Sequence, residues 1–388
     1  MTRSPWSAHR TVVHRALAPH TTKRRGPTSR TPAPRTPTSR TLGHRGLGVA
    51  AGLVLDRLLG EPPDAWHPVA WFGTAMGGIE ESVYADRHGA GAAYAVTGAA
   101  LGALAGSCLA RLGTPGLAVA VGVASAGRML RHTSADLEAL LLTDDLAGAR
   151  ERLPWLVGRD PSGLDEAGIA AAVVESLAEN TVDAVVAPAF WGLVAGAPGV
   201  LVHRAVNTMD AMVGHRSARY ARFGTVAARA DDVMAWVPAR LFAGLVAMDA
   251  GSRGLLGGVC APLSGQSAGH MCRPGPRSVH RSAGGGAGGS GRQVLAVVAR
   301  DAPAHPSPNA GVAESAVAGA LGVELGGPLE YAGRHEERPR LGSGPRPGPH
   351  DIDRARALVD RVERTLVLAG VALWLLDRAT ARRGHRWT

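Results

Sequence analysis

Lysine is almost absent from this chain: Lys23 is the only one among 388 residues. A phosphate-binding loop of the G-K-[ST] kind needs a lysine, and so does a Schiff base with pyridoxal phosphate. Because Lys23 lies in a polar N-terminal stretch, both kinds of site are excluded from the rest of the chain. Any phosphate group must therefore be bound by arginine, by a metal ion or by backbone amides.

Cysteine and aromatic residues are also scarce. Cys108, Cys260 and Cys272 show no C-x-x-C spacing, which argues against a structural zinc site and against a disulfide framework. Aromatic residues make up 4% of the chain, whereas glycine contributes 52 residues. Because apolar stretches rich in small residues alternate with very polar ones, the composition is typical of a membrane protein.

The net charge of +10 is concentrated at the N-terminus. Residues 1–45 contain ten of the 42 basic residues and no acidic one, so the remainder has 32 basic and 32 acidic residues. We expect residues 1–46, rich in Pro, Thr and Arg, to be a disordered extension. No face that interleaves basic and aromatic residues follows, so nucleic acid is not an expected partner. No signal peptide is expected either, because no apolar segment with a cleavage site follows closely.

One long uncharged run, residues 89–110, has the ~20 residues needed to cross a bilayer. Gly98, Gly102 and Gly106 recur in it at every fourth position, a spacing that lets another helix approach closely. A buried helix of a soluble protein is the alternative. Weaker candidate spans lie at residues 112–127, 184–202, 233–248 and 365–376. The sequence predicts an all-α polytopic membrane protein with about four or five spans and polar helical or loop blocks between them.

The order of polar and apolar segments predicts three parts. A membrane domain at residues 47–335 is interrupted by a flexible Gly-rich insert at about 251–293. Residues 336–388 are expected to form a loop followed by a C-terminal apolar helix.

The stretch "VVESLAENTVD", residues 173–183, spaces three carboxylates four residues apart. Asp160 before Pro161, or Ser162 with Asp165, can cap a helix here. Glu175, Glu179 and Asp183 would then share one face, where like charges repel unless a cation or a proton neutralises them. This arrangement suggests Mg²⁺ bound by Glu175, Glu179 and Asp183, with Asn180 nearby as a substrate-binding amide. A solvated acidic face explains the spacing equally well.

Two further blocks contain candidate site residues. "HRAVNTMDAMVGHRSARYARFG" has a basic stripe suited to phosphate oxygens or, alternatively, to anionic lipid headgroups. Its candidates are Asn207, Asp210, His215, Arg216, Arg219 and Arg222. Asp231 and Asp232 follow as a second metal contact or a helix cap. His305 and Asn309 lie in a proline-rich loop, where side chains are aimed with little loss of entropy. His67, before Pro68, is a weaker substrate-binding candidate.

Five ordered blocks resemble the membrane-bound cobalamin biosynthesis family, the adenosylcobinamide-phosphate synthases known as CobD or CbiB. The blocks are "LDRLLGEPPDAWHPVAWFG", "GLDEAGIAAAVVESLAENTVDAVVAPAFWGLVAGAPG", "HRAVNTMDAMVGHRSARYARFG", "ARADDVMAWVPARL" and "HPSPNAGVAESAVAGALGVELGG". They extend over roughly residues 47–335. Residues 1–46 and the long Gly-rich insert have no counterpart in the family pattern.

The resemblance implies an ATP-dependent amide-forming ligase in the cell membrane. Such an enzyme joins a side-chain carboxyl of the corrinoid adenosylcobyric acid to aminopropanol or its phosphate. ATP and Mg²⁺ would be cofactors, the lipid bilayer a partner, and other membrane enzymes of the cobalamin pathway further candidate partners. In this interpretation the three carboxylates hold Mg²⁺, Arg216, Arg219 and Arg222 neutralise phosphate, and His215 or His305 accepts the proton of the amine.

A transporter or permease is the alternative, because carboxylates near a membrane also serve ion coupling. It predicts charged residues inside the spans, whereas the polar blocks of this sequence fall mostly between the apolar runs. A non-catalytic scaffold ranks last, since it needs neither the stiff His/Asn loop nor the acidic clusters.

Overall fold

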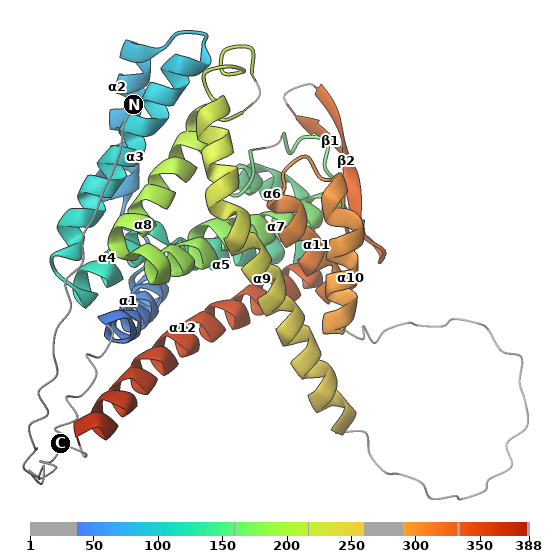
Figure 1. Ribbon diagram of the computed structural model, residues 1–388. Coiled ribbons are helices and arrows are strands. Elements are labelled where there is room, and N and C mark those ends of the chain that lie inside the picture. Colours follow the sequence, from blue (N-terminus) through green and yellow to red (C-terminus); the bar gives the residue numbers. More distant parts are fainter. Residues whose placement is uncertain (1–36, 159, 216, 260–289, 332–333, 386–388) are drawn as a thin grey trace, which may run out of the picture. The chain divides into compact units, whose positions relative to one another are not determined.

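A computed structural model describes residues 37–158, 160–215, 217–259, 290–331 and 334–385. The chain divides into two units, 1–37 and 38–388, and the first lies outside the described residues except for Pro37. The described part of the second unit is helical with one two-stranded sheet (Figure 1). Its main elements are α1 (Pro37–Leu59), α2 (Pro68–Val83), α3 (His88–Ala110), α4 (Thr114–Ala124), α5 (Gly127–Leu142), α6 (Leu146–Arg152), α7 (Glu166–Thr181), η3 (Val182–Val186), α8 (Ala187–Val213), α9 (Thr225–Val259), α10 (Gly291–Asp301), α11 (Ala310–Leu321), β1 (Glu324–Tyr331), β2 (Arg334–Gly342) and α12 (Pro349–His385).

The all-α membrane class is confirmed. Among the described residues, three helical segments are long and apolar enough to cross a membrane: His88–Ala110, Glu166–Val213 and Thr225–Arg253. This is fewer than the four or five spans expected. The run at 112–127 forms only the short helix α4, and the run at 365–376 is the middle of the much longer α12.

The helices and strands differ from the predicted organisation at three places. Helix α1 begins at Pro37, so residues 37–46 are helical rather than part of a disordered extension. Helices α9 and α10 extend to Val259 and start at Gly291, into both ends of the predicted insert, while residues 260–289 lie outside the described part. The segment after residue 336 is not a loop, because β2 and the first turns of α12 occupy most of it.

The glycine repeat of α3 packs against α8, as predicted. A Cβ atom added to Gly102 would lie 2.7 Å from the carbonyl oxygen of Leu201, and one added to Gly106 would lie 2.4 Å from Cα of Pro198. Only a hydrogen atom fits at these positions, and the two helix backbones therefore come into direct contact. This contact fixes the position of α8 against α3.

Helices α7 and α8 are continuous through η3, a π-helical turn. Helix α8 is kinked at Gly196, whose φ is +68°, and Pro198 follows inside the helix. Because proline has no N–H, it leaves the carbonyl of Val194 without its helical donor. Arg45 of α1 donates Nη1 to that carbonyl at 2.7 Å and to the carbonyl of Leu193 at 3.1 Å. The arginine therefore stabilises the kink.

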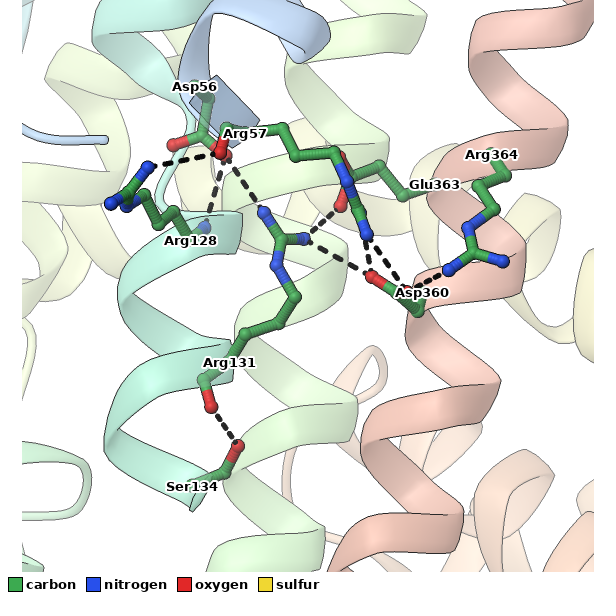
Figure 2. Close-up of polar contacts among 8 residues, drawn as sticks. All are labelled: Asp56, Arg57, Arg128, Arg131, Ser134, Asp360, Glu363 and Arg364. Carbon is green, nitrogen blue, oxygen red and sulfur yellow. Dashed lines mark hydrogen bonds and ion pairs between the residues drawn. The ribbon is translucent and has the colours of Figure 1, made fainter. Parts of the chain in front are cut away.

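A network of charged side chains joins α1, α5 and α12 (Figure 2). Arg57 makes two hydrogen bonds to Asp360, of 2.7 and 3.1 Å. Arg131 of α5 lies between the two other helices, donating to Glu363 and approaching Oδ2 of Asp56 to 3.9 Å. Since both carboxylates are almost fully buried, the guanidinium of Arg131 is the counter-charge that makes their burial tolerable.

The buried carboxyl of Asp56 should make the stability of the protein depend on pH. Burial raises its pKa to about 6, a rise that the backbone N–H of Arg128 and the charge of Arg131 only partly oppose, and to which Glu363 and Glu61 add. The folded state therefore holds this proton more tightly than the unfolded state, whose pKa is near 3.8. Protonated Asp56 therefore adds about 3 kcal/mol to the free energy of unfolding. This contribution is complete below the unfolded pKa and is lost as the pH rises through about 6.

We expect Asp56→Asn to remove this dependence, because asparagine resembles the protonated acid. Unfolding free energies of both proteins, measured from about pH 4 to pH 7, should agree at the acidic end, and the variant should become relatively more stable as the pH rises. A difference that stays constant over this range would contradict the assignment.

Candidate functional site

Asp183 occupies the π-helical turn between α7 and α8. Such turns are rare and occur frequently at functional sites. Asn207 of α8 donates Nδ2 to Oδ2 of Asp183 at 3.1 Å and lies 3.3 Å from Oδ1 of Asp231 on α9. One amide thus bridges two carboxylates that belong to different helices.

A small acidic cavity adjoins this bridge. It has a volume of about 30 Å³, and its polar lining residues are Glu179, Asp183, Asp231, Asp232, Ser307 and Asn309. That volume holds about one water-sized group. Four carboxylates around so small a space repel one another unless a cation or protons neutralise them. The cavity is therefore chemically suited to a small cation or to the ammonium group of an amine.

Asn309, the N-cap residue of α11, closes one side of the acidic cavity. Its Nδ2 donates to the backbone carbonyl of Asp232 at 2.8 Å, and its Oδ1 accepts from Nη1 of Arg240 at 2.9 Å. These bonds fix the start of α11 against α9. Asn309 and Asp231–Asp232 therefore form one rigid wall.

A larger cavity of about 550 Å³ meets the acidic one at Asp183, which lines both. Helix α2 contributes Gly73 and Thr74, and its N-cap residue His67, whose Nδ1 accepts from the backbone N–H of Val69 at 3.1 Å, also lines the cavity. Asn180 lines it as well, with its own amide bonded to Ser176. The polar lining is completed by Glu61, Arg204, Asn207 and Thr208.

A third cavity, of about 460 Å³, lies between α2, α3, α4 and α8 and is almost entirely apolar. We call it the apolar chamber. Its lining includes Phe72, Leu101, Leu109, Val119 and Leu201. The chamber shares Val69, Arg204 and Thr208 with the larger cavity, so the two spaces adjoin at these residues.

Several predicted site residues lie elsewhere. Arg219 is 3.1 Å from Glu80 and stacks on Tyr84, while Arg222 pairs with Asp86 at 3.5 Å. These two arginines join the loop after α8 to α2 and to the segment after it, and neither lines a cavity described above. His215 is exposed and packs edge-on against Tyr220. Arg216 lies outside the described residues.

Two further candidates border the site without lining these cavities. The side chain of His305 is buried; its Nδ1 accepts from the N–H of Ser307 at 3.1 Å, and its Nε2 lies 3.8 Å from Glu314. Asp210 lies one turn beyond Asn207 and interacts electrostatically with Asp232.

The three predicted metal ligands do not form one group. Within the described ranges, no three His, Cys, Asp or Glu side chains are grouped so that they could hold a metal ion by themselves. Helix α7 begins at Glu166 with Asp165 as its N-cap residue, and the π-helical turn after Thr181 changes the helical phase on which the prediction relied. The predicted caps at Asp160 and Ser162 are wrong for the same helix.

Glu175 has a different environment from the other two carboxylates. It is buried and accepts a hydrogen bond of 2.8 Å from the backbone N–H of Gly326 in β1. A register irregularity between Gly326 and Gly327 leaves that N–H available. Gly326 has a φ of +72°, and a Cβ there would lie 2.1 Å from a backbone carbonyl, so the position requires glycine. Glu175 therefore fixes the β-hairpin to α7.

We expect Glu175→Ala to destabilise the protein by about 1–3 kcal/mol, because it leaves the buried N–H of Gly326 without an acceptor. Limited proteolysis between β1 and β2 should be faster in the variant than in the parent. Protection of the hairpin equal to that of the parent would show that the bond contributes nothing.

Sequence reasoning missed Arg204 and gave Asp231 and Asp232 no definite role. Arg204 lies in the quoted block but outside its basic stripe. The signal that identifies it is helical spacing, since Arg204, Asn207 and Thr208 share one face of α8. Asp183 and Asn207 lie in the helical segment Glu166–Val213 and Asp231 lies in Thr225–Arg253, two of the segments that are long and apolar enough to cross a membrane.

Fold and site together define an all-helical membrane protein with an acidic site among its long apolar helices. The family model described as CobD/Cbib protein matches residues 49–359, and the chain belongs to this family. The chain is 40% identical to the cobalamin biosynthesis protein CobD of Mycobacterium tuberculosis (strain CDC 1551 / Oshkosh) over 337 residues, which cover 85% of this chain and 96% of the relative.

Two further relatives agree. CobD of Chromobacterium violaceum is 40% identical over 80% of this chain and 90% of its own length. The cobalamin biosynthesis protein CbiB of Salmonella typhimurium is 37% identical over 82% of this chain and 91% of its own length. No solved structure matches the chain significantly.

Proposed function

We propose that this protein is an ATP-dependent ligase of the cell membrane that forms an amide between a carboxyl group of the corrinoid adenosylcobyric acid and aminopropanol or its phosphate. The observation that carries the proposal is the meeting of a large cavity and a small acidic cavity at Asp183. A large acid and a small amine need two such spaces with a common boundary. The names of the relatives supply the corrinoid pathway.

The small acidic cavity is suited to the amine. An amino alcohol arrives as an ammonium ion, and the carboxylates of Asp183, Asp231 and Asp232 would bind and orient it. Amide formation requires the ammonium group to lose protons, and a carboxylate beside it can accept one of them. Asp183 is the best-placed acceptor because it faces both cavities. This replaces His215 and His305, which lie outside them.

The same carboxylates also fit a magnesium ion as an alternative occupant to the ammonium group, provided that a substrate completes its coordination. Mg²⁺ in nucleotide sites is held by one or two carboxylates together with phosphate oxygens and water. Asp183 and Asp231, bridged by Asn207, are the carboxylates that would hold it. The ion would neutralise phosphate charge. The carboxylate of the acid would take the γ-phosphoryl group of ATP with release of ADP, and the amine would then form the amide bond and displace inorganic phosphate, which carries one carboxylate oxygen away.

The experiment that tests the proposal is expression of the full-length chain in a host that lacks its own cobinamide-forming step. Mass spectrometry should show adenosylcobyric acid consumed and cobinamide, or cobinamide phosphate, formed. The mass of the product identifies the amine that is used. Accumulation of the acid, with the protein shown to be folded in the membrane, would contradict the ligase proposal.

Transport is the alternative that a test must exclude, because carboxylates on helices with long apolar stretches can also serve ion coupling. The relatives reported above are named for biosynthesis, and none of those names describes a transporter. Uptake of corrinoid into proteoliposomes without formation of an amide would favour transport.

A further inference from the structure

Arg204 occupies a chemically unusual position on α8. It lines both the larger cavity and the apolar chamber, and it is the only arginine or lysine among the residues that line the three cavities described above. Its Nη1 lies 3.3 Å from Oδ1 of Asn207. Its Nε is buried and has no hydrogen-bond partner among the described residues. A planar guanidinium therefore borders two open spaces with part of its donor capacity unused.

A buried guanidinium N–H without an acceptor is unfavourable unless a ligand accepts a hydrogen bond from it. Asp183 and Glu61 interact electrostatically with Arg204, whereas its Nε has no hydrogen-bond partner among the described residues. A guanidinium binds a carboxylate or a phosphate through two parallel hydrogen bonds, a geometry that a point charge cannot provide. The missing partner is therefore an anion of this kind, and in the proposed reaction the acid substrate supplies a carboxylate.

The apolar chamber shows what else the ligand carries. Around Arg204 it offers aliphatic and aromatic carbon from four helices, and its lining residues Leu101, Cys108 and Val119 are exposed, which marks where the chamber opens. Ligand sites are typically apolar spaces of this size with a few polar groups that fix orientation. An occupant must combine a bulky apolar part with one anionic group.

We propose that Arg204 binds the carboxylate of the corrinoid acid, with the methyl-bearing edge of the corrin ring in the apolar chamber. This inference rests on the proposed ligase function and assigns the acid to a defined site. Because Asn207 contacts Arg204 on one side and Asp183 on the other, a carboxylate at Arg204 lies beside the acidic cavity where the amine would bind. Arg204 is thus a residue that distinguishes the free acid from corrinoids whose carboxyl is already amidated.

The test compares two probes: the corrinoid acid and the same corrinoid with that carboxyl converted to the primary amide. Equilibrium dialysis against the purified full-length protein in detergent, followed by corrinoid absorbance, gives both dissociation constants. We expect the parent to bind the acid roughly ten- to a hundredfold more tightly than the amide, as a charge-assisted pair predicts. Arg204→Gln should bring the ratio to about one, mainly by weakening binding of the acid.

Three further variants test three separate effects. They are the loss of the paired donors of Arg204 with its charge kept, the loss of chamber volume, and the loss of an arginine elsewhere in the protein. Arg204→Lys keeps the charge but not the paired donors, so it should retain part of the preference for the acid. Ala105→Phe fills the chamber and should weaken binding of acid and amide by the same factor. Arg152→Gln, in a surface pair with Asp136 of 2.9 Å, is the matched control and should keep the parental ratio.

A preference for the acid that persists in Arg204→Gln would overturn the inference, and so would a parent protein that binds neither probe. Phospholipid that co-purifies with the parent but not with Arg204→Gln, together with an unchanged acid-to-amide ratio, would assign the chamber to lipid instead. The ligase proposal fails separately, when the parent forms no amide in the expression host. Amide formation by the parent together with an unchanged ratio in Arg204→Gln would refute only the assignment of Arg204.

Discussion

Asp183→Asn is expected to lower the rate of amide formation by about 10²- to 10⁴-fold, the range typical of a group that transfers a proton in the transition state. The side chain keeps its size and can still accept a hydrogen bond from Asn207. It can no longer accept the proton of the amine or hold a cation, because asparagine has neither charge nor basicity. The larger cavity is almost unchanged in shape, so binding of the corrinoid acid should be retained.

The measurement is product formation per amount of membrane-inserted protein, with dialysis of the corrinoid acid as a check on folding. Asp136→Asn is the matched control, since Asp136 is a half-exposed residue of α5 that pairs with Arg152 at the surface. It should keep the parental rate. Parental activity of Asp183→Asn would remove Asp183 from the mechanism.

The double substitution Gly102→Ala with Gly106→Ala is expected to give the largest loss of stability. Each added methyl group would lie within 2.4–2.7 Å of backbone atoms of α8, which cannot move aside as a flexible side chain could. Overpacking typically costs about 1–3 kcal/mol per site, and the two costs act on one helix pair. We therefore expect α3 to separate from α8 and the apolar chamber between them to be lost.

The control adds the same two methyl groups where there is room for them. Gly77 and Gly78 of α2 have no atom within 4 Å of an added Cβ, so their replacement by alanine should be neutral or stabilise the helix by up to about 1 kcal/mol per site. Denaturant unfolding in detergent compares the pairs. Equal stability of the two double variants would contradict the close packing of α3 on α8.

The sequence predicted those features that depend on local pattern. An uncharged run with a glycine every fourth residue identified α3 and its close contact, because both follow from helical period and side-chain size. The blocks that contain Asp183, Asn207 and Asn309 were recognised as sites from residue type and spacing. These three residues come from η3, from α8 and from the N-cap of α11. Asp183 and Asn309 line the acidic cavity, and Asp183 and Asn207 line the larger cavity.

Features that depend on tertiary contacts were not predicted. Spacing alone gave Glu175 and Glu179 the same role, although the first binds the backbone of a hairpin some 150 residues away in the sequence. The arginines after α8 formed a regular stripe in the sequence, yet Arg219 pairs with Glu80 of α2 and Arg222 pairs with Asp86 in the segment after α2. A helical pattern shows which residues share a face, but it does not show what that face meets.

The π-helical turn makes the site sensitive to chain length. A π turn contains about one residue more than the α-helical turn that it replaces. Deleting Val185 would allow a regular α-helix from Glu166 onwards, with the flanking helices α7 and α8 close to their present orientation and the wide turn that presents Asp183 removed. Asp183 would then move away from Asn207 and Asp231, although no residue of the site had been substituted. Single-residue deletions across 182–186 should therefore inactivate the protein.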